Sequence, residues 1–240
     1  MNIRVFDDAS QIAVAAGEVF VSLIRSKPDA ALGLATGASP VALYQYLISQ
    51  YRNGNISFRA VSAYNLDEYC DLPVEDKNSY YTFMRKNLFD HIDILPENTH
   101  IPNGNAPDMA AECRRYDGLL AAIGGVDLQL LGLGTDCHIG FNEPADAFAN
   151  GTFRVKLHES TIESNSVYFD ENPMPRYAVT MGAGTIMTAK KIVLIATGKA
   201  KAQAVLDMVK GPVTPRHPAS ILQEHADATV YLDKAAAALL

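Results

Sequence analysis

The sequence predicts an α/β fold with a doubly wound, mostly parallel sheet and helices on both faces. Short runs rich in Val, Ile and Leu recur along the chain, bounded by Gly, Pro, Asn or Asp, which is typical of buried strands. These runs are Ala30–Leu34, Ala60–Leu66, Val126–Leu133, Ile192–Ala196 and Thr229–Leu232. Segments with helical spacing separate them, and this alternation implies crossover connections and a covered, Rossmann-like sheet.

Two helices are expected from the spacing of their apolar residues. One follows Pro40, which suits the first turn of a helix, and its inward positions are Val41, Tyr44, Leu47, Ile48 and Tyr51. The other follows Asp108, a typical capping residue, and its inward positions are Met109, Cys113, Tyr116, Leu120 and Ile123. Gly124 and Gly125 should end this second helix.

We expect residues 1–240 to form one domain, because no repeat, low-complexity tract or linker divides the chain. Residues 150–178 are the least regular part, with Asn, Ser and two prolines, and could form a mobile flap.

Composition excludes several classes of protein. With 48% hydrophobic and 20% charged residues, the 240-residue chain is not disordered. Its net charge of −7 opposes nucleic-acid binding, and no apolar run approaches the roughly 20 residues that cross a bilayer. The acidic N-terminal segment does not resemble a signal peptide, and the three cysteines form no CxxC pair. We therefore expect a cytoplasmic protein without nucleic-acid or membrane partners.

Ligands bind beyond the carboxyl ends of the strands in such sheets, so the loops after the apolar runs are the candidate sites. The first loop contains Thr36, Gly37, Ala38 and Ser39, just before Pro40. Its hydroxyls and the free N–H groups at the helix start could bind a phosphate. An ordinary turn capped by Ser39 explains the loop equally well. The loop is neither GxGxxG nor GxxxxGK[ST], which argues against dinucleotides and nucleoside triphosphates.

The second loop places two adjacent acids, Asp67 and Glu68, at the end of a strand. Neighbouring side chains on a strand point to opposite faces, so only one of the two can face a cleft. One of them could be a general base, although a capping or solvated aspartate is the commoner role.

The third loop gathers Asp136, His138 and Glu143 within eight residues of a glycine-interrupted segment. A carboxylate beside an imidazole fixes its tautomer and stabilises the imidazolium, which suits proton transfer near neutral pH. A capping aspartate with a buried histidine is the alternative. No HExxH motif or cysteine pair is present, so we expect no metal. Lys201 could reach a phosphate, though a solvated lysine is usual at such a position.

In order and type, these loops resemble those of the glucosamine-6-phosphate deaminase (isomerase) family. The resemblance spans nearly the whole chain, through LGLATGASP, NLDEY, NSYYTFMRKNLFDHIDI, IPNGNAPD, AECRRY, HIGFNEP, AVTMGAGTI and PASILQEH. The related 6-phosphogluconolactonases share the fold and a similar Asp-x-His loop, but continue that loop differently.

The resemblance implies that glucosamine 6-phosphate and water are converted to fructose 6-phosphate and ammonia, without metal or organic cofactor. His138, supported by Asp136 and Glu143, would open the sugar ring, and Asp67 would move a proton from C2 to C1. The phosphate would be bound by Thr36, Gly37, Ala38, Ser39 and Lys201.

The sequence departs from the family pattern at three positions, of which Ala38, where glycine is common, is the mildest change. Cys137 stands where a glycine is usual, so a positive φ would strain it and disturb His138. Val167 stands where the family has a phosphate-binding arginine, a loss of about 1–3 kcal/mol unless another arginine replaces it. The candidates for replacement are Arg154, Arg176 and Arg216. We expect deaminase activity with a raised KM.

Two alternatives stay open from the sequence: an enzyme for another amino-sugar phosphate, such as galactosamine 6-phosphate, and a degenerate sugar-phosphate-binding protein. The sequence does not decide between a monomer and a homo-oligomer. Allosteric members of the family that the sequence resembles carry a long tail, whereas only a few residues follow the last apolar run here, so the resemblance implies non-allosteric behaviour.

Overall fold

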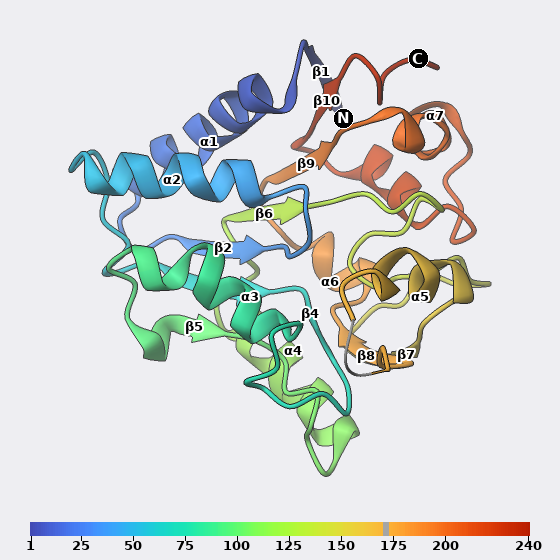
Figure 1. Ribbon diagram of the computed structural model, residues 1–240, viewed down its shortest axis with the longest axis horizontal. Helices are drawn as coiled ribbons and strands as arrows, with labels where there is room; N and C mark the ends of the chain where they lie inside the picture. Colours follow the sequence, from blue (N-terminus) through green and yellow to red (C-terminus); the bar gives the residue numbers. More distant parts are fainter. Residues whose placement is uncertain (170–172) are drawn as a thin grey trace.

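The computed structural model describes residues 1–169 and 173–240, and its central element is a seven-stranded parallel sheet (Figure 1). The strand order is β1-β10-β9-β6-β2-β3-β5. The bounds are β1 (Asn2–Phe6), β2 (Ala31–Leu34), β3 (Ser62–Asn65), β5 (Thr99–His100), β6 (Leu128–Leu131), β9 (Ile192–Ala196) and β10 (Ala228–Asp233). All five apolar runs form strands of this sheet, which confirms the predicted fold class.

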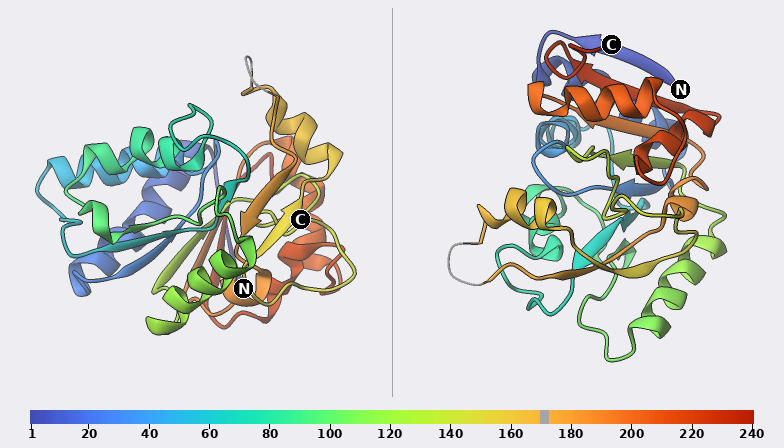
Figure 2. Two further views of the ribbon diagram at one scale, coloured as in Figure 1. Left: turned by 90° about the horizontal axis from the view of Figure 1, so that it is seen from below. Right: turned by 90° about the vertical axis from the view of Figure 1, so that its right-hand side faces the viewer.

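Helices lie on both faces of the sheet, with α2 and α3 on one face and α4 on the other (Figure 2). The helices are α1 (Ala9–Ser26), α2 (Val41–Arg52), α3 (Tyr80–Asn87), α4 (Met109–Ala122), α5 (Glu159–Ser166), α6 (Ala183–Ile186) and α7 (Ala202–Lys210). Asp108 caps α4 by accepting the Ala111 N–H at 2.9 Å. Beyond α4, Gly124 and Gly125 have φ of 68° and 81°, so both predicted helix signals are confirmed. No helix among the described residues is long and apolar enough to cross a membrane.

The direction of winding reverses between β2 and β6, which are neighbours in the sheet. From β2 the chain builds outward through β3 to β5, whereas from β6 it builds the other way through β9 to β10. The loops that follow β2 and β6 therefore diverge and leave a crevice at their carboxyl ends. This topology brings the first and third candidate loops together.

A second, antiparallel sheet has the order β4-β8-β7. Its strands are β4 (Asp67–Tyr69), β7 (Phe153–Lys156) and β8 (Tyr177–Thr180). The sequence did not predict this sheet, and residues 150–178, expected to be irregular, contain β7, α5 and the start of β8. Residues 170–172 of that segment lie outside the described residues, and the expected flap stays a prediction.

A single residue, Leu66, separates β3 from β4 and hydrogen-bonds to both sheets. Its N–H donates to the Leu34 carbonyl at 3.2 Å, and its carbonyl accepts the Met181 N–H at 2.8 Å. Asp67 is therefore held at the carboxyl edge of the parallel sheet, next to the crevice.

At the opposite edge, the buried Asp127 carboxylate just before β6 joins three segments. It accepts hydrogen bonds from Lys27 Nζ and Lys190 Nζ at 2.7 Å each and from the Ala31 N–H at 2.8 Å. Burial opposes ionisation, but the two lysines and the amide outweigh it and lower the pKa of Asp127 to about 2.

The substitution Asp127→Asn should lower the free energy of unfolding by about 1–3 kcal/mol, because charge-assisted hydrogen bonds to a buried group are lost. The folded pKa lies below the value of about 3.9 for an unfolded aspartate. The stabilisation is therefore present above pH of about 4 and is lost as pH falls through about 2. Urea unfolding at several pH values measures both effects.

The matched control is Asp29→Asn, which removes an exposed carboxylate 3.8 Å from the same Lys27 Nζ. An exposed pair contributes little, so this variant should unfold like the parent. Equal destabilisation by the two variants would contradict a special role for Asp127.

Candidate active site

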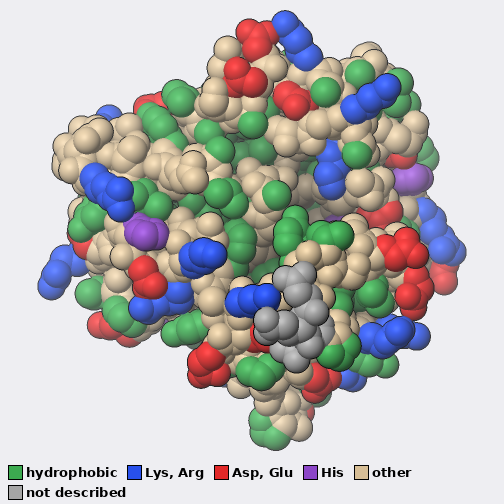
Figure 3. Space-filling model, viewed as in Figure 1, with side chains coloured by type: hydrophobic (Ala, Val, Ile, Leu, Met, Phe, Trp, Pro, Cys, Tyr) green, Lys and Arg blue, Asp and Glu red, His purple; other side chains and the backbone are tan. Residues whose placement is uncertain are grey.

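A cavity of about 440 Å³ lies at the carboxyl ends of β2 and β6. Figure 3 shows this face of the molecule hollowed near its centre. Eight of the nine predicted site residues line the cavity: Thr36, Gly37, Ala38, Ser39, Asp67, Asp136, His138 and Lys201. Four segments far apart in the sequence thus converge on one space, as the function inferred from the sequence requires.

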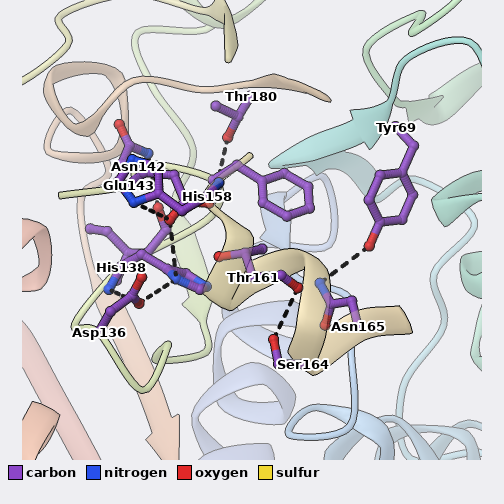
Figure 4. Close-up of polar contacts among 12 residues, drawn as sticks. Tyr69, Asp136, His138, Asn142, Glu143, His158, Thr161, Ser164, Asn165 and Thr180 are labelled. Carbon is purple, nitrogen blue, oxygen red and sulfur yellow. Dashed lines mark hydrogen bonds and ion pairs between the residues drawn. The ribbon is translucent and has the colours of Figure 1, made fainter. Parts of the chain in front are cut away.

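The imidazole of His138 is held by carboxylates from its own loop (Figure 4). Asp136 Oδ1 lies 2.6 Å from His138 Nδ1, and Glu143 Oε2 lies 4.0 Å from the same nitrogen. A Cβ at Gly134 would collide with the imidazole, so the ring lies directly on a glycine of the loop. Burial opposes ionisation of Asp136, but the hydrogen bond and charge of His138 outweigh it and lower the pKa of Asp136. Asp136 can therefore orient the imidazole of His138 and stabilise its protonated form.

Glu143 is the one predicted site residue that does not line the cavity. It is buried behind His138, and its Oε1 accepts the His158 N–H at 3.2 Å. Its Oε2 also lies 3.7 Å from His158 Nδ1. Glu143 can therefore act on His138 electrostatically, but it does not face a ligand in the cavity.

Asp67 and Glu68 point in different directions, as the alternation along a strand predicts. Asp67 faces the cavity, whereas Glu68 accepts the N–H groups of Tyr80 and Tyr81 at 2.9 Å each. Glu68 thereby satisfies two free N–H groups at the start of α3, whose N-cap residue is Ser79.

Burial is the main cause of a shifted pKa at Asp67, a residue that is only 5% exposed. Burial, aided by the charge of Glu68 and opposed by a hydrogen bond from Thr180, raises the pKa of Asp67 to about 8. Gly140 of the third loop lies beside it, since a Cβ there would be 3.3 Å from Asp67 Oδ2. A carboxyl group with this acidity can exchange protons near neutral pH.

The loop after β2 turns at Gly37, where φ is 90°. No side chain caps the following helix α2, so the alternative of a Ser39 cap is not supported. Lys201 lines the same cavity, and within the described residues no carboxylate lies within ion-pair distance of its amine. Burial lowers the pKa of Lys201, while the charge of Asp136 opposes the shift. The loop and the lysine thus offer donors to an anion.

The strain expected at Cys137 is present, because its φ is 70°. Its buried Sγ lies 3.5 Å from the Ala204 carbonyl, and burial raises the pKa of the thiol to about 12. The neighbouring His138 nevertheless keeps its 2.6 Å contact with Asp136. The substitution therefore adds backbone strain without separating the pair.

No arginine lines the cavity in the described part of the chain, where Lys201 is the sole lysine or arginine among the lining residues. Val167 follows α5 and is 70% exposed. The three arginines considered as replacements instead contact acids, in the pairs Arg154–Asp71, Arg176–Glu159 and Arg216–Asp146. The suggestion that one of them takes the place of the family arginine gains no support.

The sequence analysis missed the cavity residues contributed by α5 and by neighbouring segments. These are Ser160, Thr161, Ser164, Asn165, Tyr168, Tyr80 and Thr197. The α5 residues recur at helical spacing, but they are polar. The sequence therefore shows no apolar stripe that would predict an inward face for this helix. Tyr80 also stacks on Phe141, with ring centroids 5.9 Å apart.

One oxygen or nitrogen from each of Asp136, His138 and Glu143 lies within 4.8 Å of the others, a spacing that a cation could share. Acidic clusters of this kind are common at proton-transfer sites as well. The expectation that the protein needs no metal therefore stays a prediction.

The model of the family "Glucosamine-6-phosphate isomerases/6-phosphogluconolactonase" matches residues 7–231. The chain belongs to this family. Members named glucosamine-6-phosphate deaminase are similar to it over its full length. A Clostridioides difficile protein is 46% identical, with 97% of the relative covered, and a Pseudoalteromonas translucida protein is 49% identical, with 90% covered.

Solved structures of the glucosamine-6-phosphate isomerase/6-phosphogluconolactonase family agree with this assignment. One described as a monomeric glucosamine-6-phosphate deaminase superposes with a TM-score of 0.97 at 42% identity, covering 100% of both chains. A 6-phosphogluconolactonase from Trypanosoma cruzi shares the fold, with a TM-score of 0.81 at 20% identity over 100% of this chain and 96% of that one. The resemblance inferred from the sequence motifs is confirmed.

The strain at Cys137 can be measured by comparing two substitutions. Both Cys137→Gly and Cys137→Ala remove the buried sulfur, but only glycine adopts φ of 70° without cost. The glycine variant should therefore be more stable than the alanine variant by about 1 kcal/mol, the reverse of the order at ordinary positions. Urea unfolding checks this order, and an alanine variant as stable as the glycine variant would show that the backbone is unstrained.

Proposed function

We propose that this enzyme converts glucosamine 6-phosphate and water to fructose 6-phosphate and ammonia. The observation that carries the proposal is the convergence of Asp67, the Asp136–His138 pair and Lys201 on one cavity. The pKa of Asp67 is raised and the pKa of Asp136 is lowered, so Asp67 can act as a general base while ionised Asp136 stabilises the histidine. This combination suits proton transfer.

The reaction begins with opening of the pyranose ring. His138 accepts the proton of the anomeric hydroxyl and returns one to the ring oxygen, so that the ring C–O bond breaks and an aldehyde forms at C1. Asp136, 2.6 Å from His138 Nδ1, orients the ring and stabilises its charged form. Glu143 adds negative charge from behind the imidazole.

Asp67 then moves a proton between the two reacting carbons. The C2–H of the open aldehyde is acidic, and the Asp67 carboxylate removes its proton while the aldehyde oxygen takes a proton from the C2 ammonium group, which gives an enolamine. Returning the proton to C1 leaves a hydroxyl on C1 and a protonated imine at C2. Addition of water to C2 and loss of ammonia produce the ketone, so atoms and charge balance without an external oxidant or reductant.

The phosphate is bound away from the reacting carbons, by Lys201 and the loop from Thr36 to Ser39. Contacts with this remote group fix the position of C1 and C2 between the catalytic side chains. Because the lining of the described cavity contains no arginine, substrate binding depends on a single cation, and we infer a raised KM.

A degenerate binding protein is less well supported than an enzyme, because all four proton-transfer residues are present and three of them face the cavity. The structure offers no observation that favours galactosamine 6-phosphate over glucosamine 6-phosphate, so the epimer assignment rests on the relatives.

Substitution of Asp67→Asn should lower kcat by roughly 10²-fold or more, because the amide cannot accept the C2 proton. Fructose 6-phosphate formation in a coupled assay, together with ammonia release, measures the loss. The variant should remain folded. A buried carboxyl group with a raised pKa lowers the free energy of unfolding above pH of about 4, where the unfolded chain ionises, and the neutral asparagine has the same shape without this cost.

The control for this variant is Asp71→Asn, the same change at an exposed position two residues beyond β4. It should keep full activity. An Asp67→Asn enzyme with unchanged turnover would exclude Asp67 as the base.

The pH dependence of kcat/KM should follow the raised pKa of Asp67. Below about 8 the side chain is mostly protonated and cannot act as a base, so kcat/KM should rise with pH, reach half of its maximum near that value and level off above it. Initial rates at fixed ionic strength between about pH 6 and 9 test the profile. A rate that is constant over this range would contradict a buried carboxyl base.

A further inference from the structure

The helix α5 presents an uncharged polar face to the cavity (Figure 4). The cavity-lining residues of this segment are Ser160, Thr161, Ser164, Asn165 and Tyr168. They recur at spacings of three and four, so they occupy one side of the helix. The same cavity is bounded elsewhere by the charged residues assigned to proton transfer and to phosphate binding.

Thr161 differs from its neighbours on this face because its hydroxyl is buried and has no partner among the described residues. The residue is 2% exposed, and its Oγ1 makes no hydrogen bond with residues 1–169 or 173–240. By contrast, the Ser164 hydroxyl donates to the Thr161 carbonyl at 3.0 Å, and Asn165 Nδ2 donates to the Tyr69 hydroxyl at 3.3 Å. Buried hydroxyls are normally hydrogen-bonded, so an unpaired one on a cavity wall indicates a missing partner in the cavity.

We propose that Thr161 determines substrate affinity by hydrogen-bonding a hydroxyl group of the bound hexose. This inference rests on the proposed function and names a contact that its mechanism does not use. The hydroxyl of Thr161 is turned toward the side of α5 on which His138 lies (Figure 4), and both residues line the cavity. His138 acts at the sugar ring, so Thr161 faces the ring.

The chemistry of this face also favours a neutral group as the partner of Thr161. The described lining contributes one cation, Lys201, which is assigned to the phosphate, and α5 contributes none. A threonine hydroxyl both donates and accepts, as a sugar hydroxyl does, so the two can pair in either sense.

The test uses Thr161→Val, which keeps the shape of the side chain and removes only the hydroxyl. The unliganded variant should unfold at the same temperature as the parent or higher, because an unpaired buried polar group is removed. Its KM for glucosamine 6-phosphate and its Kd for fructose 6-phosphate should both rise about 3- to 10-fold, the value of one neutral hydrogen bond, with kcat little changed. A purely structural threonine would give the opposite pattern, with lower stability and unchanged affinity.

Two control variants isolate the hydroxyl. Thr161→Ser keeps it and should bind fructose 6-phosphate within about twofold of the parent. Ser166→Ala removes an exposed hydroxyl of α5 that is not among the lining residues and should bind like the parent. If Thr161→Val does not fold, Thr161→Ala takes its place in the same binding measurement.

The remaining outcomes separate this inference from the proposed function. Unchanged affinity of Thr161→Val for fructose 6-phosphate would overturn the role of Thr161, even with a fully active parent enzyme. Equal weakening of inorganic phosphate binding would also overturn it, because the contact would then be with phosphate. A parent enzyme that releases no ammonia from glucosamine 6-phosphate would overturn the proposed function, while the fructose 6-phosphate measurement would still decide the role of Thr161.

Discussion

The backbone of Leu66 bonds to both sheets, and the geometry of the candidate site depends on this connection. Its N–H group donates to Leu34 of the parallel sheet, and its carbonyl accepts the N–H of Met181, which directly follows β8 of the small sheet. Asp67 follows directly, so its carboxyl group is fixed relative to the loop after β2. Because α5 joins β7 to β8 of the small sheet, the same connection sets the position of the helix that closes one wall of the cavity.

Burial opposes the charged forms of Asp67, Asp136 and Lys201 in this cavity, and the neighbouring groups decide how each pKa changes. Asp67 is desolvated beside another acid, so its pKa is raised to about 8. Asp136 is also desolvated, but contact with His138 reverses the effect and lowers its pKa. Two carboxyl groups of the same type thereby receive different roles, one as a base near neutral pH and one as a permanent anion.

Much of the fold could be predicted from the sequence, because buried parallel strands read as continuous apolar runs and their carboxyl ends locate the loops. The small sheet could not, since β4 has three residues and β7 has four, which is too short for the alternation of apolar and polar residues to stand out. The cavity-lining face of α5 could not be predicted either, because its residues are polar and form no apolar stripe at helical spacing. The position of Glu143 behind His138 depends on the local path of the loop, which spacing alone does not fix.

The loss of an arginine at Val167 changes how the site must bind an anion. Val167 is mostly exposed and is not among the cavity-lining residues, so in the proposed mode of binding the phosphate depends on Lys201. Burial lowers the pKa of this lysine, which means that its charge is poorly solvated before a ligand binds. A bound phosphate would supply the missing counter-charge, and each neutral hydrogen bond from the loop after β2 and from α5 then carries a larger share of the affinity. The polar face of α5 thus takes on more importance in this chain than in one with a cavity-facing arginine.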